Sequence, residues 1–180
     1  MTIAFEIRPA QAHEEWAVAQ LFEGLHHYNT SLDPYFSLSS DWREALQTFL
    51  IDQALNQRGI TMLAWYGAKP IGLLMLAGQQ GSALFKHRNW AELLALYVVH
   101  DVRGQGVAQR LLNLAQAWAS QQGYQRMQLY VTASNQRAKR FYQAQGWQCV
   151  QEIWRLSLDQ GQQLADIDEQ MSVCLSNERE

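Results

Sequence analysis

The chain has 180 residues, of which 48% are hydrophobic, with a net charge of −3 at neutral pH and two cysteines. This length and composition suit one domain with a full core, and no apolar run is long enough to span a bilayer. The small net charge gives no indication of a nucleic-acid partner. Cys149 and Cys174 lie in strand-like runs without metal-ligand spacing. We therefore expect buried, reduced thiols, no metal and a soluble cytoplasmic protein; the many Gln and Trp residues favour a bacterial source.

Hydrophobic periodicity predicts the elements of the first hundred residues. Alternation of apolar and polar residues indicates strands, and apolar residues spaced three or four apart indicate helices. Asp41 and Glu44 suit a capping box, and polar stretches at 29–40 and 78–89 predict loops. The expected elements are a strand at 3–8, helices at 12–25 and 41–56, a hairpin of strands at 59–66 and 70–77, and a buried strand at 90–99.

The second part of the chain continues with helices between short strands. We expect a helix at 107–122 ended by Gly123, a strand at 127–131, a helix capped by Ser134 and ended by Gly146, and strands at 148–158 and 171–175. The order is thus β-α-α-β-β-β-α-β-α-β-β. Runs of consecutive strands favour an α/β fold of the α+β kind, with a mixed rather than a doubly wound sheet. No repeat or linker interrupts it, so a single domain is expected over residues 1–180.

The hexapeptide Arg103-Gly104-Gln105-Gly106-Val107-Ala108 lies between a predicted strand and a predicted helix. Two glycines allow a sharp turn, and the unpaired N–H groups of the first helical turn favour phosphate. Gln109 stands where a dinucleotide fingerprint has its third glycine, and no Gly-Lys-Ser/Thr follows, which opposes both nucleotide-binding templates. Residues 103–158 hold seven basic residues and one acidic residue, a balance that favours an anionic ligand. We predict a phosphate-bearing ligand held by the main chain.

This hexapeptide resembles Arg/Gln-x-x-Gly-x-Gly/Ala, the acyl-CoA loop of the GNAT superfamily of N-acetyltransferases. About thirty residues later, the segment 134–147 is similar to the family's second motif, Asn-x-x-Ala-x-x-Phe-Tyr-x-x-x-Gly-Phe, with Trp147 as the last aromatic residue. The specific match covers residues 92–147. The resemblance implies the GNAT fold, in which the fourth and fifth strands splay apart, and acetyl transfer from acetyl-CoA to an amine.

The resemblance also implies roles for individual residues. The N–H of Val98, near a strand bulge, would stabilise the oxyanion, and Tyr142 would protonate the departing sulfur. Arg103 would supply charge near the phosphates and Asn135 would contact the cofactor. The pyrophosphate would be held by the N–H groups of Gly104, Gln105, Gly106, Val107 and Ala108.

The general base is the least specified group. Many relatives carry a carboxylate at the position of Leu94, whereas Glu92 lies two residues earlier on the same face of the strand. Glu92 could act through a water molecule, because only about one aliphatic amine in a thousand is unprotonated at neutral pH. His26, His27 and Tyr28, near the end of the first helix, are alternatives. Tyr142 could instead be an aromatic residue of the core. Asn135 could instead bond the backbone at the start of its own helix.

The acceptor is predicted from charge alone. Six acidic residues lie on the first two predicted helices and the loop between them: Glu14, Glu15, Glu23, Asp33, Asp41 and Glu44. Their charge would attract a cationic amine, either a small molecule or a protein side chain. Alternatively, they form an ordinary solvated surface. Neither nucleic acid nor membrane is expected as a partner, and exposed edge strands would allow a homodimer. A non-catalytic acyl-CoA-binding regulatory domain is the alternative function, since Leu94 replaces the usual base.

Overall fold

The computed structural model describes residues 4–157, in two compact units that divide between Lys139 and Arg140. The first unit carries a five-stranded sheet in the order β1-β2-β3-β4-β5. The strands are β1 (Glu6–Pro9), β2 (Gly59–Tyr66), β3 (Lys69–Gln80), β4 (Asn89–Val98) and β5 (Met127–Leu129). Neighbours from β1 to β4 are antiparallel, and β5 pairs parallel with β4 over three residues only, Ala91 to Leu93. The predicted mixed sheet is therefore confirmed.

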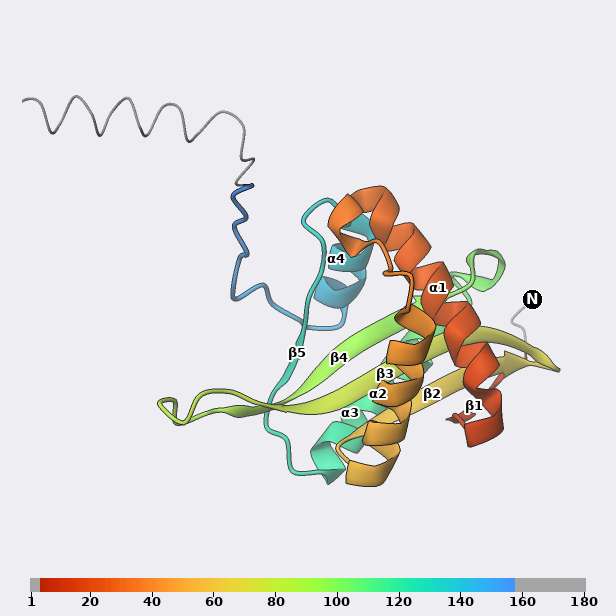
Figure 1. Cartoon of the computed structure of the whole chain (residues 1–180), viewed down its shortest axis with the longest axis horizontal. Coiled ribbons are helices and arrows are strands. Elements are labelled where there is room, and N and C mark those ends of the chain that lie inside the picture. The colour runs from red at the N-terminus through yellow and green to blue at the C-terminus, as the bar shows by residue number, and fades with distance from the viewer. Residues whose placement is uncertain (1–3, 158–180) are drawn as a thin grey trace, which may run out of the picture. The chain divides into compact units, whose positions relative to one another are not determined.

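Helices cover both faces of this sheet (Figure 1). On one face lie α1 (Glu15–Leu32) and α2 (Trp42–Asn56), with the short 3-10 turns η1 (Ala12–Glu14) and η2 (Pro34–Phe36). On the other face lies α3 (Val107–Gln121), preceded by the turn η3 (His100–Val102). The helix α4 (Gln136–Ala144) continues from the first unit into the second.

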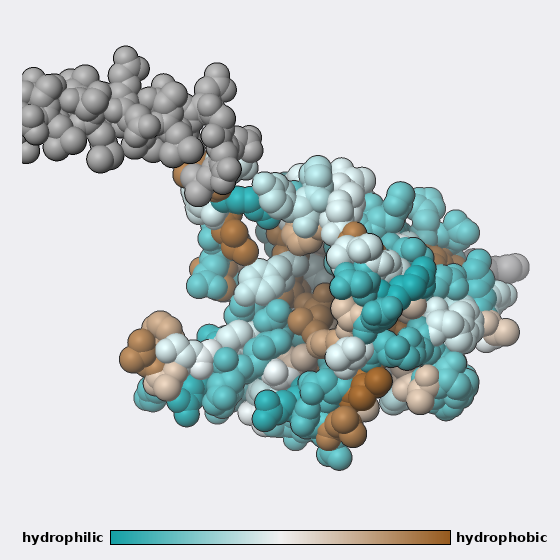
Figure 2. Space-filling view, viewed as in Figure 1, coloured by the Kyte–Doolittle hydropathy of each residue, from teal (hydrophilic) through white to brown (hydrophobic). Residues whose placement is uncertain are grey.

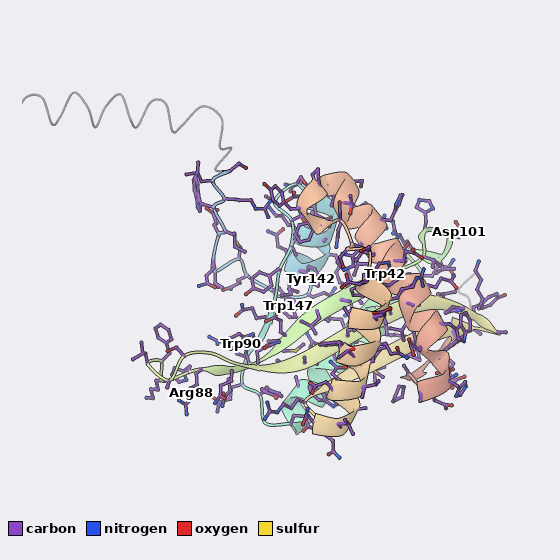
Figure 3. All side chains as sticks on the ribbon, in the orientation of Figure 1. Trp42, Arg88, Trp90, Asp101, Tyr142 and Trp147 are labelled. Atoms are coloured by element: carbon purple, nitrogen blue, oxygen red, sulfur yellow. The ribbon has the colours of Figure 1, made fainter. Side chains whose placement is uncertain are left out.

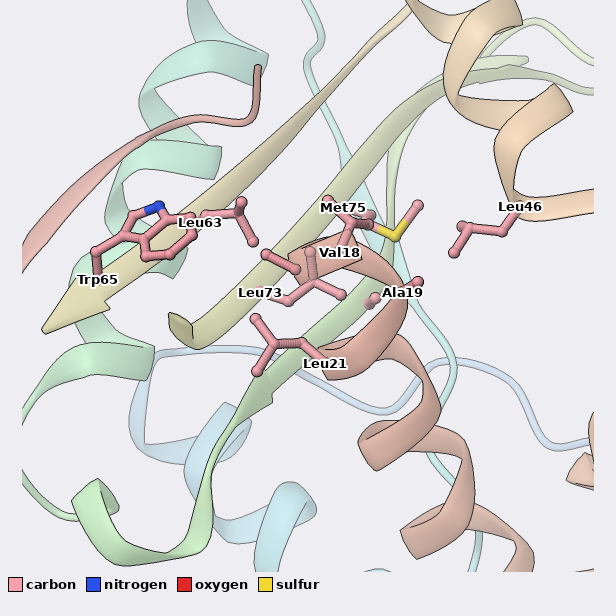
Figure 4. Packing of buried hydrophobic residues seen from close by; sticks show 10 residues of the cluster. Val18, Ala19, Leu21, Leu46, Leu63, Trp65, Leu73 and Met75 are labelled. Atoms are coloured by element: carbon pink, nitrogen blue, oxygen red, sulfur yellow. The ribbon is translucent and has the colours of Figure 1, made fainter. Parts of the chain in front are cut away.

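The core under α1 and α2 is apolar and fully enclosed. Val18, Leu21 and Leu46 from the helices meet β2 and β3 side chains such as Leu63 and Leu73 (Figure 4). Removing these side chains from water supplies most of the driving force for folding, at roughly 1.5–3 kcal/mol for each large residue. On the opposite face α3 approaches β3 so closely that a Cβ at Gly72 would lie 3.1 Å from Leu111. These contacts fix α1 and α3 against the strands that carry the site.

Several boundaries differ from the sequence-based prediction. The first helix continues to Leu32 rather than ending at Leu25. No residue between them disfavours a helical backbone, whereas Pro34 disfavours helical backbone angles at the residue before it. Asp41 is the N-cap of α2, but its side chain makes no cap bond, so the predicted capping box is wrong. A reciprocal capping box forms instead between Gln11 and Glu14.

Towards the C-terminus the predicted strands are shorter or missing. β5 ends at Leu129, and residues 148–157 form no strand, so that part of the expected 148–158 strand is wrong. Cys149 is exposed rather than buried, because no sheet covers it. Cys174 and the predicted strand at 171–175 lie outside the described residues. The prediction of one domain over residues 1–180 therefore stays a prediction.

Candidate active site

The glycine-bearing loop turns the chain from β4 into α3. Gly104 has φ +80° and Gly106 has φ +83°, in the left-handed region that costs an L side chain energy. A Cβ at either glycine would have no neighbour within 4 Å, so both face open space. The first bond of the α3 ladder runs from the Arg110 N–H to the Gly106 oxygen (3.0 Å). The N–H groups of Val107 and Ala108 thus precede the ladder, as a helix start provides for an anion.

This geometry fits the diphosphate of acetyl-CoA. The α3 helix is 15 residues long, so its dipole adds partial positive charge at the end that the loop presents. No side chain projects from the two glycines, which lets a bulky anion approach the main chain closely. The residues that would hold the cofactor are the five named from the sequence, Gly104 through Ala108.

Arg103 folds back against β4. Its Nε donates a hydrogen bond to the Val98 oxygen (2.8 Å), and its guanidinium lies 5.8 Å from the Tyr28 ring centre and 5.7 Å from that of Tyr97. The side chain therefore joins the loop to α1 and to the end of β4. The positive charge of Arg103 therefore lies where the loop meets the end of β4. A contact between Arg103 and the phosphates of the cofactor remains a prediction.

A bulge interrupts β4 in the middle of the site. Met75 of β3 pairs with Ala95, and Leu76 pairs with Leu93, so Leu94 is an extra residue on β4. The family resemblance implied a bulge in this strand near Val98, and the structure has one four residues before it. Sequence patterns by themselves carry no signal for a single inserted residue in an apolar run. Leu94 is 38% exposed although it lies in the middle of a sheet, because the bulge turns it outward.

The bulge also decides where the Val98 N–H points. The Ala91 N–H donates to the Arg126 oxygen (2.9 Å), towards β5, whereas the Val99 N–H donates to the Ile71 oxygen (3.0 Å), beside β3. Eight residues apart, these groups would face the same edge of a regular strand. One extra residue reverses the alternation, so the Val98 N–H faces the edge that β5 has left. Among residues 4–157 no strand pairs with β4 there.

Glu92 lies at the other end of β4 from this edge. Its carboxylate accepts a hydrogen bond from the Trp90 indole (3.1 Å), and the Trp90 ring in turn contacts the guanidinium of Arg126 at 5.2 Å. Trp90 lies towards the β3–β4 hairpin, whereas Trp42 lies on α2 (Figure 3). The structure thus orients Glu92 by a neighbour on its own strand and does not place it in the lining of the cavity described next.

A cavity of about 570 Å³ opens between α1, η2, α2 and the bulge of β4. Its volume is in the range of about 300–1,000 Å³ typical of small-molecule sites. Most of its lining is aromatic or aliphatic: Phe22, His26, Tyr35, Phe36, Ser37, Leu38, Ser39, Trp42, Ala45, Leu46, Phe49, Met75 and Leu94. Of this set, only His26 and Leu94 were singled out from the sequence as residues of the acceptor side. Tyr35 through Ser39 come from the predicted loop at 29–40, Met75 comes from the predicted strand at 70–77, and the others come from the core faces of helices.

His26 is the titratable ring of this cavity. It is half-buried and tilted against Phe22, with ring centres 4.4 Å apart. Its Nδ1 lies 3.4 Å from the Phe36 carbonyl oxygen, which can only accept, so this contact favours the tautomer with the proton on Nδ1 and a lone pair on Nε2. Burial lowers the pKa of His26 below the ordinary 6.5, and the Phe36 carbonyl only partly opposes this. The ring is therefore neutral at pH 7.

Five of the six acidic residues that could attract a cationic amine have side-chain partners of their own. Glu14 is buried in an ion pair with Arg8, which lowers the pKa of its carboxyl to about 2. Glu23 pairs with Arg43 (3.1 Å). Three others accept hydrogen bonds from neutral donors: Glu15 from Gln47, Asp33 from the Tyr35 N–H, and Asp41 from Ser39. None of the six is among the residues that line the cavity.

Asn135 caps α4. Its Oδ1 accepts the Ala138 N–H (3.1 Å), which identifies Asn135, rather than the predicted Ser134, as the N-cap. A local role thus accounts for the side-chain oxygen, and the cofactor contact stays a prediction.

Tyr142 belongs to the second unit. Its ring packs against Phe141 (5.2 Å) and Trp147 (5.7 Å), and burial raises the pKa of its hydroxyl above the usual 10.0. The phenol therefore keeps its proton throughout the neutral range and is able to donate it. Figure 3 shows Tyr142 and Trp147 as neighbours in this unit.

The model of the acetyltransferase (GNAT) family matches residues 18–147, well over half of the chain. The chain belongs to this family. It is a GNAT-family N-acetyltransferase, and enzymes of the family use acetyl-CoA as the acetyl donor. The predicted family, fold and enzyme class are thereby confirmed.

Solved structures of other acetyltransferases share the fold. The aminoglycoside 6'-N-acetyltransferase AAC(6')-Ig of Acinetobacter haemolyticus is 17% identical with a TM-score of 0.66, over 86% of this chain and 98% of that one. A GCN5-related N-acetyltransferase of Ralstonia eutropha gives the same identity and TM-score, over 87% and 100%. The aminoglycoside acetyltransferase AAC(6')-Iy, solved with CoA, is 16% identical with a TM-score of 0.66, over 86% and 94%. At these identities the likeness shows the fold.

A curated relative matches locally. The mycothiol acetyltransferase of Jonesia denitrificans is 43% identical over 61 residues, which is 34% of this chain. The match spans about a fifth (19%) of that relative's length. In residues 4–157 no helix is long and apolar enough to cross a membrane, and no three potential metal ligands cluster.

Proposed function

We propose that this enzyme transfers the acetyl group of acetyl-CoA directly to a primary amine of a small molecule or a protein. The observation that carries the proposal is the open pair of glycines, Gly104 and Gly106, at the start of α3, beside the unpaired edge of β4. When bound, acetyl-CoA supplies an acetyl thioester. The chain's own residues then hold the cofactor, orient the acetyl carbonyl, accept a proton from the amine and donate one to the leaving thiol.

The main chain supplies the first two tasks. The N–H groups of Gly104 through Ala108 hold the diphosphate, with Asn135 as a further contact and Arg103 lending charge. The Val98 N–H faces the edge that β5 leaves, and we assign it as the hydrogen-bond donor to the acetyl carbonyl. Such a donor is worth about 10²–10³ in kcat where it is fixed before the reaction. The Arg103 bond to the Val98 oxygen supports this, because it fixes the end of the same strand.

His26 is proposed as the proton acceptor, in preference to Glu92. It lines the cavity, is neutral at pH 7 and has its tautomer set by the Phe36 carbonyl. Glu92 remains the second candidate, since its carboxylate is oriented by Trp90 on the same strand face as Leu94. A general base in either position is expected to contribute about 10²–10⁴ in rate.

Tyr142 is proposed as the proton donor to the thiolate of CoA that departs when the thioester C–S bond breaks. The raised pKa keeps its hydroxyl protonated at neutral pH, which a general acid requires. The family motif around it supports the assignment, as does the absence of any carboxylate in the 134–147 segment that could serve instead.

The direct test is thiol release from acetyl-CoA in the presence of a panel of primary amines, followed by mass spectrometry of the acetylated product. The proposal predicts amine-dependent thiol release in step with N-acetyl product. Saturable binding of CoA without acetylation of any amine would instead support a non-catalytic acyl-CoA-binding domain.

A further inference from the structure

We propose, on the basis of the proposed function, that the acceptor is a small amine with an aromatic or bulky apolar body, seated in the cavity between α1, η2, α2 and the β4 bulge. The acidic residues of the first two helices left two interpretations open, a cationic small-molecule or protein amine as acceptor and a plain solvated surface. The cavity that the fold builds has the opposite chemistry, and it ends on β4 at Leu94, four residues before Val98.

The polar groups of the cavity are few and neutral. No carboxylate lines it, and the only side chain there that titrates near neutrality is His26, whose buried ring resists protonation. A polyamine or aminoglycoside would bring several ammonium groups into this space with no counter-charge. Burying an unpaired cation is strongly unfavourable. An amine with a single nitrogen needs only one polar partner, and His26 provides it.

The aromatic rings do not form a cage for a cation. Trp42 stacks on Phe22 with ring centres 6.0 Å apart, and the guanidinium of Arg43 lies 4.4 Å from the Trp42 ring centre. Trp42 thus already contacts a cation, which is paired with Glu23, and its ring packs against Phe22. It is therefore not a free partner for the ammonium group of an acceptor.

Apolar side chains are exposed where this cavity opens. Phe36 is 37% exposed, Leu94 is 38% exposed and Tyr35 is 69% exposed, and all three line the cavity. A ring placed among them would remove their apolar surface from water, which favours binding in proportion to the area covered. A second exposed apolar group, Leu84 and Phe85 at the tip of the β3–β4 hairpin (Figure 2), lies outside the cavity and provides a control.

The experiment compares kcat/KM for 2-phenylethylamine, butylamine, spermidine, kanamycin and a lysine peptide, with binding of CoA measured on the same protein. We expect 2-phenylethylamine to exceed butylamine and spermidine by at least about tenfold, since one apolar group in a fitted pocket is worth about 10–200-fold. Equal or better turnover of spermidine, kanamycin or the peptide would overturn this inference and leave the acetyltransferase proposal standing. Turnover of no amine would overturn both.

Two substitutions locate the binding. Phe36→Ala leaves the carbonyl that bonds His26 in place and removes only the ring. We expect it to raise KM for 2-phenylethylamine about tenfold while KM for acetyl-CoA changes less than about twofold. The matched control Phe85→Ala, at the hairpin tip, should leave both KM values unchanged. Equal KM values in Phe36→Ala and the wild type would place the aromatic amine elsewhere and contradict the inference.

Discussion

The cofactor loop and the acceptor cavity are built in opposite ways. The loop uses the main chain of consecutive residues, 103–108, and needs glycines because an anion must approach the backbone. The cavity uses side chains from α1, η2, α2, β3 and β4, which lie between Phe22 and Leu94 in the sequence. The cofactor is thus held by backbone N–H groups, whereas the acceptor meets side chains, which differ from one protein to the next.

The strongest test of this contrast is Gly106→Trp. The indole would fill the open space at the helix start and block the diphosphate, so we expect the affinity for acetyl-CoA to fall at least about 100-fold, equivalent to about 2.7 kcal/mol. The matched control is Gly67→Trp in the β2–β3 turn, where φ is also positive (+58°) and the space is also open. Calorimetry should show normal binding in the control; a similar loss in both would mean that strain, not blockage, is responsible.

The second-largest effect is expected from the proposed proton acceptor, which lies in the acceptor cavity and not in the cofactor loop. His26→Gln should lower kcat by about 10²–10⁴ without changing the affinity for CoA. In the wild type the neutral ring is the active form, so kcat should fall as the pH drops through the pKa of His26, which burial places below 6.5. That acid limb should vanish in His26→Gln. If Glu92→Gln removes the limb and His26→Gln keeps it, Glu92 is the base.

Tyr142→Phe tests the proton donor. We expect kcat to fall about 100-fold with the affinity for acetyl-CoA nearly intact, because only the hydroxyl is lost. Tyr66→Phe, on an exposed tyrosine of β2, serves as the control. A parallel loss of kcat and cofactor affinity in Tyr142→Phe would indicate a structural role in packing with Phe141 and Trp147.

The smallest effect is expected at Arg103, which joins the cofactor loop to α1 and to the end of β4. Arg103→Lys keeps the charge but loses the fork that bonds the Val98 oxygen and contacts Tyr28 and Tyr97. We expect kcat to fall about fivefold, on the scale of about 1 kcal/mol for an aromatic–cation contact. If kcat is unchanged and only the affinity for CoA falls, Arg103 acts through its charge on the phosphates alone.

The same contrast explains what the sequence could predict. The loop, the α3 helix to within a residue of its end and the whole of β2 were predicted because local patterns determine them. The bulge in β4 was expected only from the family resemblance, since the position of one inserted residue depends on how β3 and β4 pair. The lining of the cavity was not predicted, because Phe36 and Trp42 acquire a shared surface only when α1 folds over β4. The described part of the strand expected at 148–158 is absent, because a strand needs a partner that its own alternation cannot supply.

The central claim is that backbone N–H groups at one turn hold the cofactor. Backbone amide NMR of the ¹⁵N-labelled enzyme during titration with CoA tests it most directly, because it observes these groups one by one. The account predicts saturable shifts at Gly104, Gly106, Val107 and Ala108, with Gly67 unmoved. If CoA binds and these four resonances stay in place, the diphosphate is held elsewhere and the account is contradicted.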